Sequence, residues 1–348
     1  MEPIAQLLQE HISRHPKLEV QDGVKFLYQS FLGPGHLIYD PSVLRRRLNE
    51  EWSSIEGDPD APLYESLGNG LCRLHLSACK GKLLSSNTLL RLFCSTAETV
   101  SPQNEAFHRS LSLLSLLPQP KETIEAYIRE YRAQGYPSVS HSEAYRSAYH
   151  PAYRVVWESF AGLVPILAAI DTRMSQGTPV RVAIDGPCAS GKSTLGNTLA
   201  SLYGCPLFHM DDFFLRPEQR TQQRLEEPGG NVDYERFQEQ VLSPLCAGET
   251  VRYRPWHCHE GDFGPELVVP PTPLTIVEGS YALRPDLRDH YHLRIWVEVP
   301  WSLRAERLIQ RGGPTCLERF EQLWVPLENR YFSACQVKTC CHIQYPET

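Results

Sequence analysis

The sequence lacks a long apolar run, and it also lacks the start of a secretion signal. No apolar stretch approaches the ~18 residues that a membrane-spanning helix needs. The first residues, Met1-Glu2-Pro3, provide neither the basic region nor the apolar region of a signal peptide. We therefore expect a cytoplasmic protein that has no membrane partner.

An excess of positive charge and paired cysteines are also missing. Lys and Arg number 34 against 41 Asp and Glu, which gives a net charge of −7 and argues against a general nucleic-acid binder. The 11 cysteines are scattered and form no C-x-x-C pair, so neither a zinc ribbon nor a thioredoxin-type redox pair is indicated. The 41% hydrophobic content is nevertheless ordinary for a globular protein with a packed core.

The length and one break in the pattern predict two domains. At roughly 150 residues per domain, 348 residues correspond to about two. The segment 175–179, Ser-Gln-Gly-Thr-Pro, follows an apolar stretch and interrupts any helix before it. We predict a mostly helical N-terminal domain of unassigned role over residues 1–174, where no alternation of apolar and polar residues indicates a sheet. A second domain is predicted over residues 179–348.

One N-terminal turn presents titratable and amide side chains. Gly33-Pro34-Gly35 forms a tight turn that is followed at once by His36 and preceded by Gln29. Gln29 and His36 could line a small-molecule site, or His36 could cap a helix or satisfy a buried carbonyl. Both interpretations stay open.

In the second domain, apolar strand-like runs alternate with helical patterns. We expect strands over 180–185, 206–210, 274–277 and 293–299, and helices over 193–203, 234–246, 301–311 and 317–332. Continuous Val, Ile and Leu strands in this alternation are typical of a parallel sheet that is covered on both faces. The predicted fold class is therefore α/β, a parallel sheet flanked by helices and preceded by the mostly helical domain.

A phosphate-binding loop follows the first of these strands. Residues 186–193 match the pattern G-x-x-x-x-G-K-[ST] between a strand and a helix, which is the context that supports such a match. Backbone N–H groups and the helix N-terminus would hold phosphate, Lys192 would add a full charge, and the Ser193 hydroxyl would bind Mg²⁺. The sequence thus predicts a P-loop NTPase-type domain that binds ATP through these residues: Gly186, Pro187, Cys188, Ala189, Ser190, Gly191, Lys192, Ser193 and Thr194.

Two further strand ends carry carboxylates. Asp211 and Asp212 follow the strand at 206–210, and Glu278 ends the strand at 274–277. The carboxyl ends of parallel strands meet at one edge of a sheet, so these groups should face the phosphates. One carboxylate could accept a proton from an attacking hydroxyl, and another could orient Mg²⁺ and its waters. No N-K-x-D base reader of GTPases is present.

The order of these motifs resembles the uridine kinase family, within the group that includes phosphoribulokinase and bacterial pantothenate kinase. The resemblance covers about residues 179–340 and rests on these segments: the phosphate loop, 210–214 (MDDFF), 231–237 (NVDYERF), 254–256 (RPW) and 277–279 (VEG). It implies that Asp211 is the catalytic base and that Asp233 contacts the acceptor's ribose hydroxyls. It also implies that Trp256 lies near the acceptor's ring and that Glu278 helps to hold the metal.

The family also closes a basic lid over the phosphates. Arg304, Arg307 and Arg311 recur at three- and four-residue spacing before the hinge-like pair Gly312-Gly313, and they could neutralise the transferring phosphate. We assign Arg307 and Arg311 a catalytic role beside Asp211 and Lys192. The lid is shorter than is usual in the family, and the acceptor segment lacks the family's aromatic-Asp pair.

These observations predict an ATP- and Mg²⁺-dependent kinase that phosphorylates a hydroxyl of uridine, cytidine or a related small acceptor. The alternatives are a kinase of pantothenate or a sugar phosphate, and a nucleotide-dependent regulator whose helical half binds a partner. A third is an N-terminal half that is a second enzyme using His36. The sequence does not assign the acceptor, and it leaves open a homo-oligomer.

Overall fold

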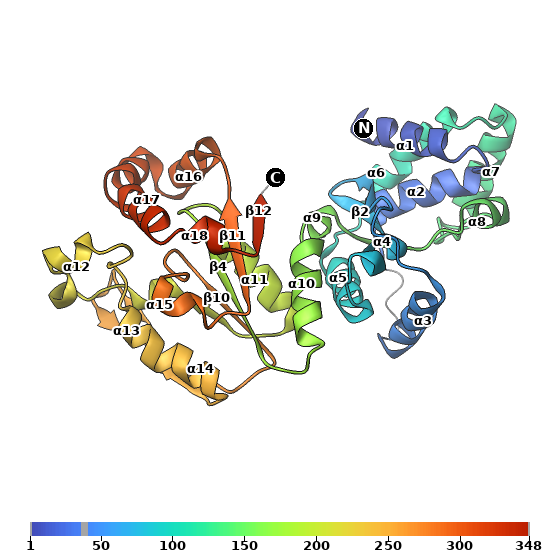
Figure 1. The fold of residues 1–348 in the computed structure, drawn as a ribbon. Coiled ribbons are helices and arrows are strands. Elements are labelled where there is room, and N and C mark those ends of the chain that lie inside the picture. Colours follow the sequence, from blue (N-terminus) through green and yellow to red (C-terminus); the bar gives the residue numbers. More distant parts are fainter. Residues whose placement is uncertain (1, 36–40, 347–348) are drawn as a thin grey trace. The chain divides into compact units, whose positions relative to one another are not determined.

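The computed structural model describes residues 2–35 and 41–346, so His36 lies outside the described residues. The chain divides into two compact units, Met1–Asp171 and Thr172–Thr348 (Figure 1). No helix of the described ranges combines the length and the apolar character needed to cross a membrane.

The first unit combines many helices with a small sheet that the sequence did not predict. Strands β1 (Tyr64–Gly68), β2 (Leu71–His75) and β3 (Tyr153–Trp157) form an antiparallel sheet in the order β1-β2-β3. The predicted mostly helical character of this region is confirmed, and the sheet is a feature that no alternation in the sequence indicated. Strand β2 shows no alternation of apolar and polar residues because four of its five residues are buried. The other two strands are also only five residues long.

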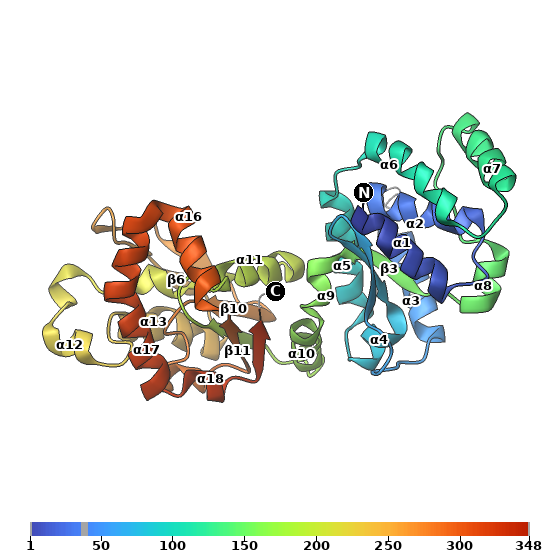
Figure 2. The same ribbon diagram turned by 90° about the horizontal axis from the view of Figure 1, so that it is seen from above.

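The helices of the first unit pack around this sheet (Figure 2). Leu8, Val24 and Phe107 belong to one apolar core with Leu67 and Val155 of the strands, so α1, α2 and α6 share a core with the sheet. The helices are α1 (Glu2–Arg14), α2 (Val20–Leu32), α3 (Pro41–Ser54), α4 (Leu76–Gly81), α5 (Ser86–Thr99), α6 (Asn104–Ser110), η2 (Leu111–Leu116), α7 (Lys121–Ala133), α8 (Glu143–Tyr149), α9 (Glu158–Ala161) and α10 (Val164–Met174), which crosses the boundary between the units.

The second unit confirms the predicted α/β class. Five parallel strands form a sheet in the order β12-β11-β4-β10-β5, with helices around it. The strands are β4 (Val180–Asp185), β5 (Leu207–His209), β10 (Leu274–Glu278), β11 (Leu293–Glu298) and β12 (Ile343–Pro346), the last of which the sequence did not predict. Two small antiparallel pairs are formed by β6 (Val251–Tyr253) with β9 (Leu267–Val269) and by β7 (Trp256–His257) with β8 (Asp262–Phe263).

The sheet is buried because its residues are apolar on both faces. Ala183, Phe208, Val277 and Trp296 share one core with residues of the helices after β5 and of the C-terminal helices. Helix α11 packs against β10 and β5, where Gly196 lets it approach Leu207 and Glu278. The helical segments are α11 (Lys192–Tyr203), η3 (Met210–Phe213), η4 (Pro217–Gln219), α12 (Gln222–Glu226), α13 (Tyr234–Phe237), η5 (Gln238–Leu242), α14 (Ser243–Ala247), α15 (Pro285–Arg288), α16 (Trp301–Arg319), η6 (Phe320–Trp324), α17 (Val325–Ala334) and α18 (Val337–Cys340).

Candidate functional site

The phosphate loop joins the end of β4 to the start of α11, and its backbone requires glycine at its first position. Gly186 has a φ of +150°, and a Cβ there would lie 2.4 Å from the carbonyl oxygen of Val297. Ala189 (φ +58°) and Gly191 (φ +100°) also adopt the left-handed region. A loop in this conformation, followed by the N-terminus of a twelve-residue helix, is suited to hold an anion on backbone N–H groups.

Asp185, the residue directly before the phosphate loop, holds the loop in place and was not among the site residues predicted from the sequence. The Asp185 carboxylate is fully buried and accepts hydrogen bonds from the Gly186 N–H (2.7 Å), the Leu283 N–H (3.0 Å) and the Tyr331 hydroxyl (2.7 Å). Burial raises the pKa of Asp185 to about 6. Its position as the last residue of an apolar strand is the only sequence signal that could have indicated this role.

Lys192 and Ser193 lie at the start of α11, as the motif predicts. The Lys192 ammonium is buried and donates to the Pro187 carbonyl oxygen across the loop (2.9 Å). The Ser193 hydroxyl donates to Glu278 Oε1 (3.0 Å), which also accepts from His209 Nδ1 (2.6 Å). The hydrogen bond to Glu278 raises the pKa of His209. A hydroxyl and a carboxylate therefore meet directly beside the phosphate loop.

The parallel register brings Asp211 to the same edge. Glu278 lies beside Ile184 of β4 on one side and beside His209 of β5 on the other, and Asp211 follows His209 by two residues in η3. Among the described residues, no hydrogen bond engages the Asp211 carboxylate, although it interacts electrostatically with Lys192. Burial by surrounding protein atoms, followed by the negative charge of Glu278, raises its pKa. Asp212 instead accepts a hydrogen bond from the Tyr253 hydroxyl (3.0 Å).

The first two predicted lid arginines contact the phosphate loop through its carbonyl oxygens. Arg304 Nε donates to the Cys188 carbonyl (2.7 Å), and Arg307 Nη1 donates to that of Ala189 (3.0 Å). Arg311 is exposed at the end of the regular part of α16, where Gly312 and Gly313 have non-helical backbone angles. The structure thus brings Arg304 and Arg307 to the loop and does not bring Arg311 there.

A second buried carboxylate, Glu328 of α17, completes the support of the loop. Its Oε2 accepts from the Cys188 N–H (2.9 Å) and lies 3.6 Å from Arg304 Nη2, while its Oε1 accepts from the Ser280 hydroxyl (2.8 Å). The Gly186 carbonyl oxygen lies 3.1 Å from the same hydroxyl and shares its single proton with Glu328. Glu328 was not predicted as a site residue, because nothing in the helical sequence around it indicates that its side chain is buried.

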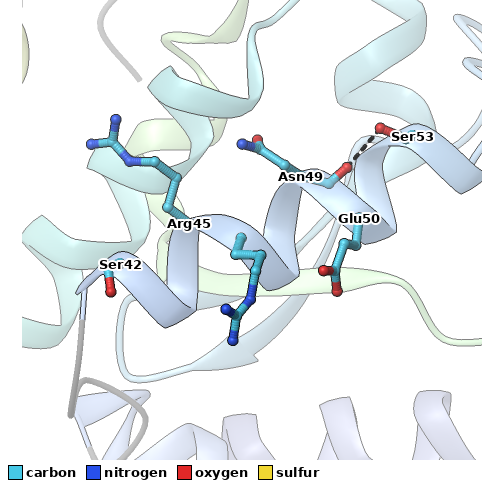
Figure 3. Close-up of a pocket in the computed structure, with 6 residues that line it drawn as sticks. Ser42, Arg45, Asn49, Glu50 and Ser53 are labelled. Atoms are coloured by element: carbon cyan, nitrogen blue, oxygen red, sulfur yellow. Dashed lines mark hydrogen bonds between the residues drawn. The ribbon is translucent and has the colours of Figure 1, made fainter.

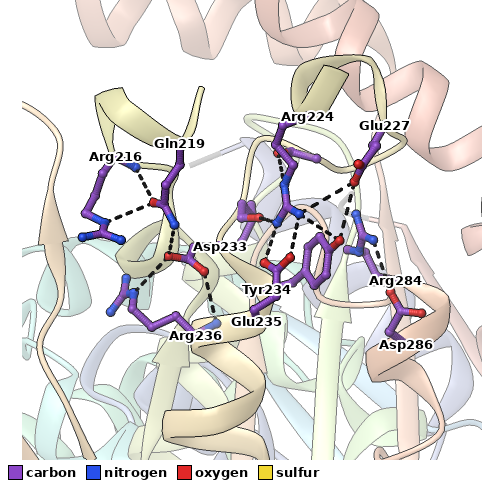
Figure 4. Close-up of polar contacts among 12 residues, drawn as sticks. Arg216, Gln219, Arg224, Glu227, Asp233, Tyr234, Glu235, Arg236, Arg284 and Asp286 are labelled. Carbon is purple, nitrogen blue, oxygen red and sulfur yellow. Dashed lines mark hydrogen bonds and ion pairs between the residues drawn. The ribbon is translucent and has the colours of Figure 1, made fainter. Parts of the chain in front are cut away.

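The residues assigned to the acceptor by resemblance have structural partners. Asp233 caps the start of α13: its Oδ1 accepts from the Arg236 N–H (3.1 Å), and its Oδ2 accepts from Gln219 Nε2 (2.8 Å) (Figure 4). Trp256 is 8% exposed and packs edge-to-face on Phe263 with a centroid distance of 5.1 Å. Neither contact brings these side chains to Asp211, so their part in binding remains a proposal.

A group of arginines that the sequence analysis did not identify surrounds Phe263. The guanidinium carbons of Arg236, Arg254 and Arg216 lie 5.3, 5.7 and 5.8 Å from its ring centroid. Backbone carbonyls orient two of them: Arg254 Nε donates to Gly264 (2.7 Å), and Arg236 Nη2 donates to Asp212 (2.7 Å). The bond to Asp212 places this group next to the predicted base.

In the first unit, Gln29 is buried inside a polar network. Its Oε1 accepts from Arg73 Nε (2.9 Å), and its Nε2 donates to the Tyr153 hydroxyl (3.2 Å). Gln29 is therefore buried and engaged by neighbouring side chains, and His36, the other residue predicted to line a small-molecule site, lies outside the described residues.

Comparisons with known proteins complete this description. No protein-family model matches the chain, and no curated protein sequence matches it. Among solved structures, the chain is similar to a possible uridine kinase from Bacillus stearothermophilus, with 17% identity over 52% of this chain and 98% of that one and a TM-score of 0.40. A candidate fructose transport system kinase from Silicibacter sp. TM1040 has 26% identity over 52% and 95%, with a TM-score of 0.43. D-glycerate 3-kinase from Cryptococcus neoformans var. grubii has 14% identity over 48% and 85%, with a TM-score of 0.34.

Proposed function

We propose that the second unit is an ATP-dependent kinase that transfers the γ-phosphate to a hydroxyl group of a small molecule. The observation that carries this proposal is the meeting of three strand ends. The phosphate loop after β4, Glu278 at the end of β10 and Asp211 after β5 lie at one edge of the parallel sheet. Nucleotide-binding groups and an unengaged carboxylate are what phosphoryl transfer to an alcohol requires.

In the proposed reaction, Asp211 takes the proton of the acceptor hydroxyl while the acceptor oxygen bonds to the γ-phosphorus. The bond between the γ-phosphorus and the bridging oxygen breaks, and ADP leaves. The raised pKa of Asp211 makes its carboxylate a better base, since proton acceptance is most effective near the working pH. Lys192 would turn from Pro187 to the phosphates, and Arg307, which contacts the loop, would neutralise the transferring group. Arg311 would have to move toward the loop to take the part that the resemblance assigns to it.

The residues beside the loop fit a magnesium ion. Ser193 and Glu278 offer a hydroxyl and a carboxylate oxygen that are 3.0 Å apart, and both are oxygen ligands of the kind that Mg²⁺ prefers. When bound, Mg²⁺ would neutralise phosphate charge. The buried hydroxyl of Ser190 has no hydrogen-bond partner among the described residues, so the loop retains an unused polar group beside the proposed nucleotide site.

The acceptor assigned by resemblance is uridine or cytidine, but one observation favours an anionic acceptor as the second candidate. Arg216, Arg236 and Arg254 converge on Phe263 next to Asp212. Arg216 and Arg236 already lie 3.3 and 3.7 Å from the carboxylates of Glu218 and Asp233, whereas among the described residues no carboxylate pairs with Arg254. The preference for an anionic acceptor therefore rests on Arg254. Oriented guanidinium groups bind carboxylates and phosphates well. A sugar phosphate or a hydroxy acid such as pantothenate would therefore find a partner here that a neutral nucleoside would not use.

The test is acceptor-dependent ADP release from ATP and Mg²⁺ by the full chain. Uridine, cytidine, pantothenate and ribulose 5-phosphate are compared. We expect at least one of them to stimulate release, and Asp211→Asn to reduce kcat by about 10²–10⁴-fold with ATP binding retained, because a general base contributes that much. The matched control is Asp212→Asn, whose wild-type carboxylate is already bound by Tyr253 and which should lose much less activity.

Other outcomes would contradict the proposal. If ATP binds but no acceptor in the panel stimulates ADP release, and Asp211→Asn leaves every measured property unchanged, the nucleotide-dependent regulator is the better account. If Asp212→Asn abolishes turnover while Asp211→Asn does not, Asp211 is not the base.

A further inference from the structure

The first unit contains a hollow whose ionisable lining is entirely basic. The hollow has a volume of about 440 Å³ and is lined by Lys25, Ser140, His141, Arg146, His150 and Pro151. These residues come from α2, from the segment before α8, and from the end of α8. The volume falls within the range of small-molecule sites, about 300–1,000 Å³. Among the residues that the structure describes, no aspartate or glutamate lines the hollow.

The cationic side chains of the hollow retain hydrogen-bond donors. Lys25 Nζ donates to the Val139 carbonyl oxygen (3.0 Å), which engages one of its three protons. Arg146 pairs with Glu143 through Nη2 (2.9 Å), but both side chains are more than half exposed, and such pairs contribute little. Both cations are therefore available to a ligand.

The floor of the hollow is held rigidly by a chain of hydrogen bonds. The Asp22 carboxylate accepts from His141 Nδ1 (2.9 Å) and from the Ser142 N–H and hydroxyl (3.0 and 2.7 Å). On its other side, His141 Nε2 bonds the Tyr153 hydroxyl (2.6 Å), which in turn bonds Gln29. Burial opposes the ionisation of Asp22, but the bonds from His141 and Ser142 outweigh it and hold its pKa at about 2. The carboxylate is thus engaged inside the floor, and its charge compensates that of Lys25 only in part.

The buried guanidinium behind this floor is itself paired. Arg73 is 1% exposed, and its Nη1 lies 3.1 Å from Glu65 Oε2, while its Nη2 has no hydrogen-bond partner among the described residues. Burial, with the charge of Arg73 as the second cause, lowers the pKa of Lys25 to about 8. An anion placed in the hollow near Lys25 would favour the charged form of this lysine.

The end of α8 brings His150 into the lining. His150 follows α8 in the left-handed conformation (φ +45°), a common ending of helices, and its backbone N–H donates to the Arg146 carbonyl oxygen. This ending places a further basic side chain in the lining of the hollow.

A second hollow in the same unit provides a contrast (Figure 3). It has a volume of about 790 Å³ and is lined by residues of a single helix, α3, including Arg45, Arg46 and Glu50. The described lining of this second hollow contains both basic and acidic side chains and comes from α3 alone, so its charge does not favour an anion. The hollow at Lys25 differs in both respects.

We propose that the first unit binds a small anionic molecule, through a phosphate or carboxylate group held by Lys25 and Arg146 with His150 at the rim. This site lies in the unit to which the kinase proposal assigns no role, and it does not depend on that proposal. The shared chemistry is an oxyanion with several acceptor atoms, which two cationic donors can bind together.

The test measures the protection of Lys25 in the full chain. The protein is labelled with an amine-reactive acetyl ester, and the modification of each lysine is read by peptide mass spectrometry. The additions are inorganic phosphate, succinate, or sodium chloride at the same ionic strength. Phosphate at about ten times its dissociation constant should slow the labelling of Lys25 about tenfold. Exposed Lys17 of the same unit should be unaffected. Because each lysine is read separately, phosphate bound to the loop of the second unit does not enter the result.

Variants then assign the site. Arg146→Ala should abolish the protection of Lys25, whereas Arg132→Ala, a change at an exposed arginine of α7, should preserve it. Protection by phosphate alone identifies a phosphate ligand, and protection by both anions identifies a site for oxyanions in general. The proposal is overturned if neither anion protects Lys25 more than chloride does, or if Arg146→Ala leaves the protection intact.

Discussion

The support of the phosphate loop by Glu328 leads to a quantitative prediction. The carboxylate accepts two hydrogen bonds, from the Cys188 N–H and the Ser280 hydroxyl, and lies 3.6 Å from Arg304. Hydrogen bonds to a charged group contribute about 1.5–3 kcal/mol each. Removing one partner of a buried ion pair costs about 3–5 kcal/mol, because the other charge stays buried. Arg304 is 8% exposed and would be that charge.

We therefore expect Glu328→Ala to lower the free energy of unfolding of the second unit by about 3–5 kcal/mol. Glu328→Gln keeps the shape and one acceptor oxygen, so it should cost about 1–3 kcal/mol. Loss of the bond to the Cys188 N–H should also weaken ATP binding about tenfold, which corresponds to about 1.4 kcal/mol. The exposed Glu321 of η6 provides the matched control, Glu321→Ala, which should change neither quantity.

Urea unfolding followed by tryptophan fluorescence suits this measurement, because four of the six tryptophans, at positions 256, 296, 301 and 324, belong to the second unit. Titration with ATP gives the affinity. If Glu328→Ala unfolds at the same urea concentration as the wild type and binds ATP equally well, the loop does not depend on this carboxylate and the reasoning is refuted.

Two further predictions concern the first glycine of the loop and the acid stability of the first unit. Gly186→Ala places a Cβ 2.4 Å from the Val297 carbonyl oxygen at a φ of +150° and should abolish ATP binding in a titration. The control Gly204→Ala, at a φ of +63° but in open space, should leave ATP binding intact. Equal effects of the two substitutions would rule out the contact with Val297 as the cause. Burial lowers the pKa of His141 to about 4, so its stabilising contribution is complete above pH 6.5 and is lost as the pH falls toward 4. By pH 5 the loss should be about 2 kcal/mol. Urea unfolding at pH 7 and pH 5 should show this extra loss in the wild type and not in His141→Gln; an equal loss in both would contradict it.

The phosphate loop could be predicted from sequence because its function is local. The pattern from Gly186 to Ser193 fixes a backbone conformation and a helix start by itself, and the apolar strand before it fixes which edge of the sheet it occupies. The convergence of Asp211 and Glu278 could also be anticipated, since the carboxyl ends of parallel strands share one edge. Both inferences need only the chain direction of the strands and not their packing.

The supports of the loop could not be predicted in the same way. Glu328 lies 140 residues after Cys188, and nothing in a helical sequence tells which of its glutamates will be buried. The first unit's sheet was missed for a different reason. Gly68-Asn69-Gly70, three successive residues with positive φ, is a hairpin signal that the sequence contains. The strands on either side are too short, and β2 too completely buried, to alternate.

The two units differ in what their buried charges indicate. In the second unit, Asp185 and Glu328 accept hydrogen bonds from backbone N–H groups of the phosphate loop, so the buried carboxylates hold the loop that we propose to bind phosphate. In the first unit, His141 engages the carboxylate of Asp22, and the cations Lys25 and Arg146 line the hollow. A buried charge is costly unless it is paired, and Arg73 meets this requirement through Glu65, at 3.1 Å. The proposed anions would therefore be held by backbone N–H groups in the second unit and by side chains at the surface of the hollow in the first.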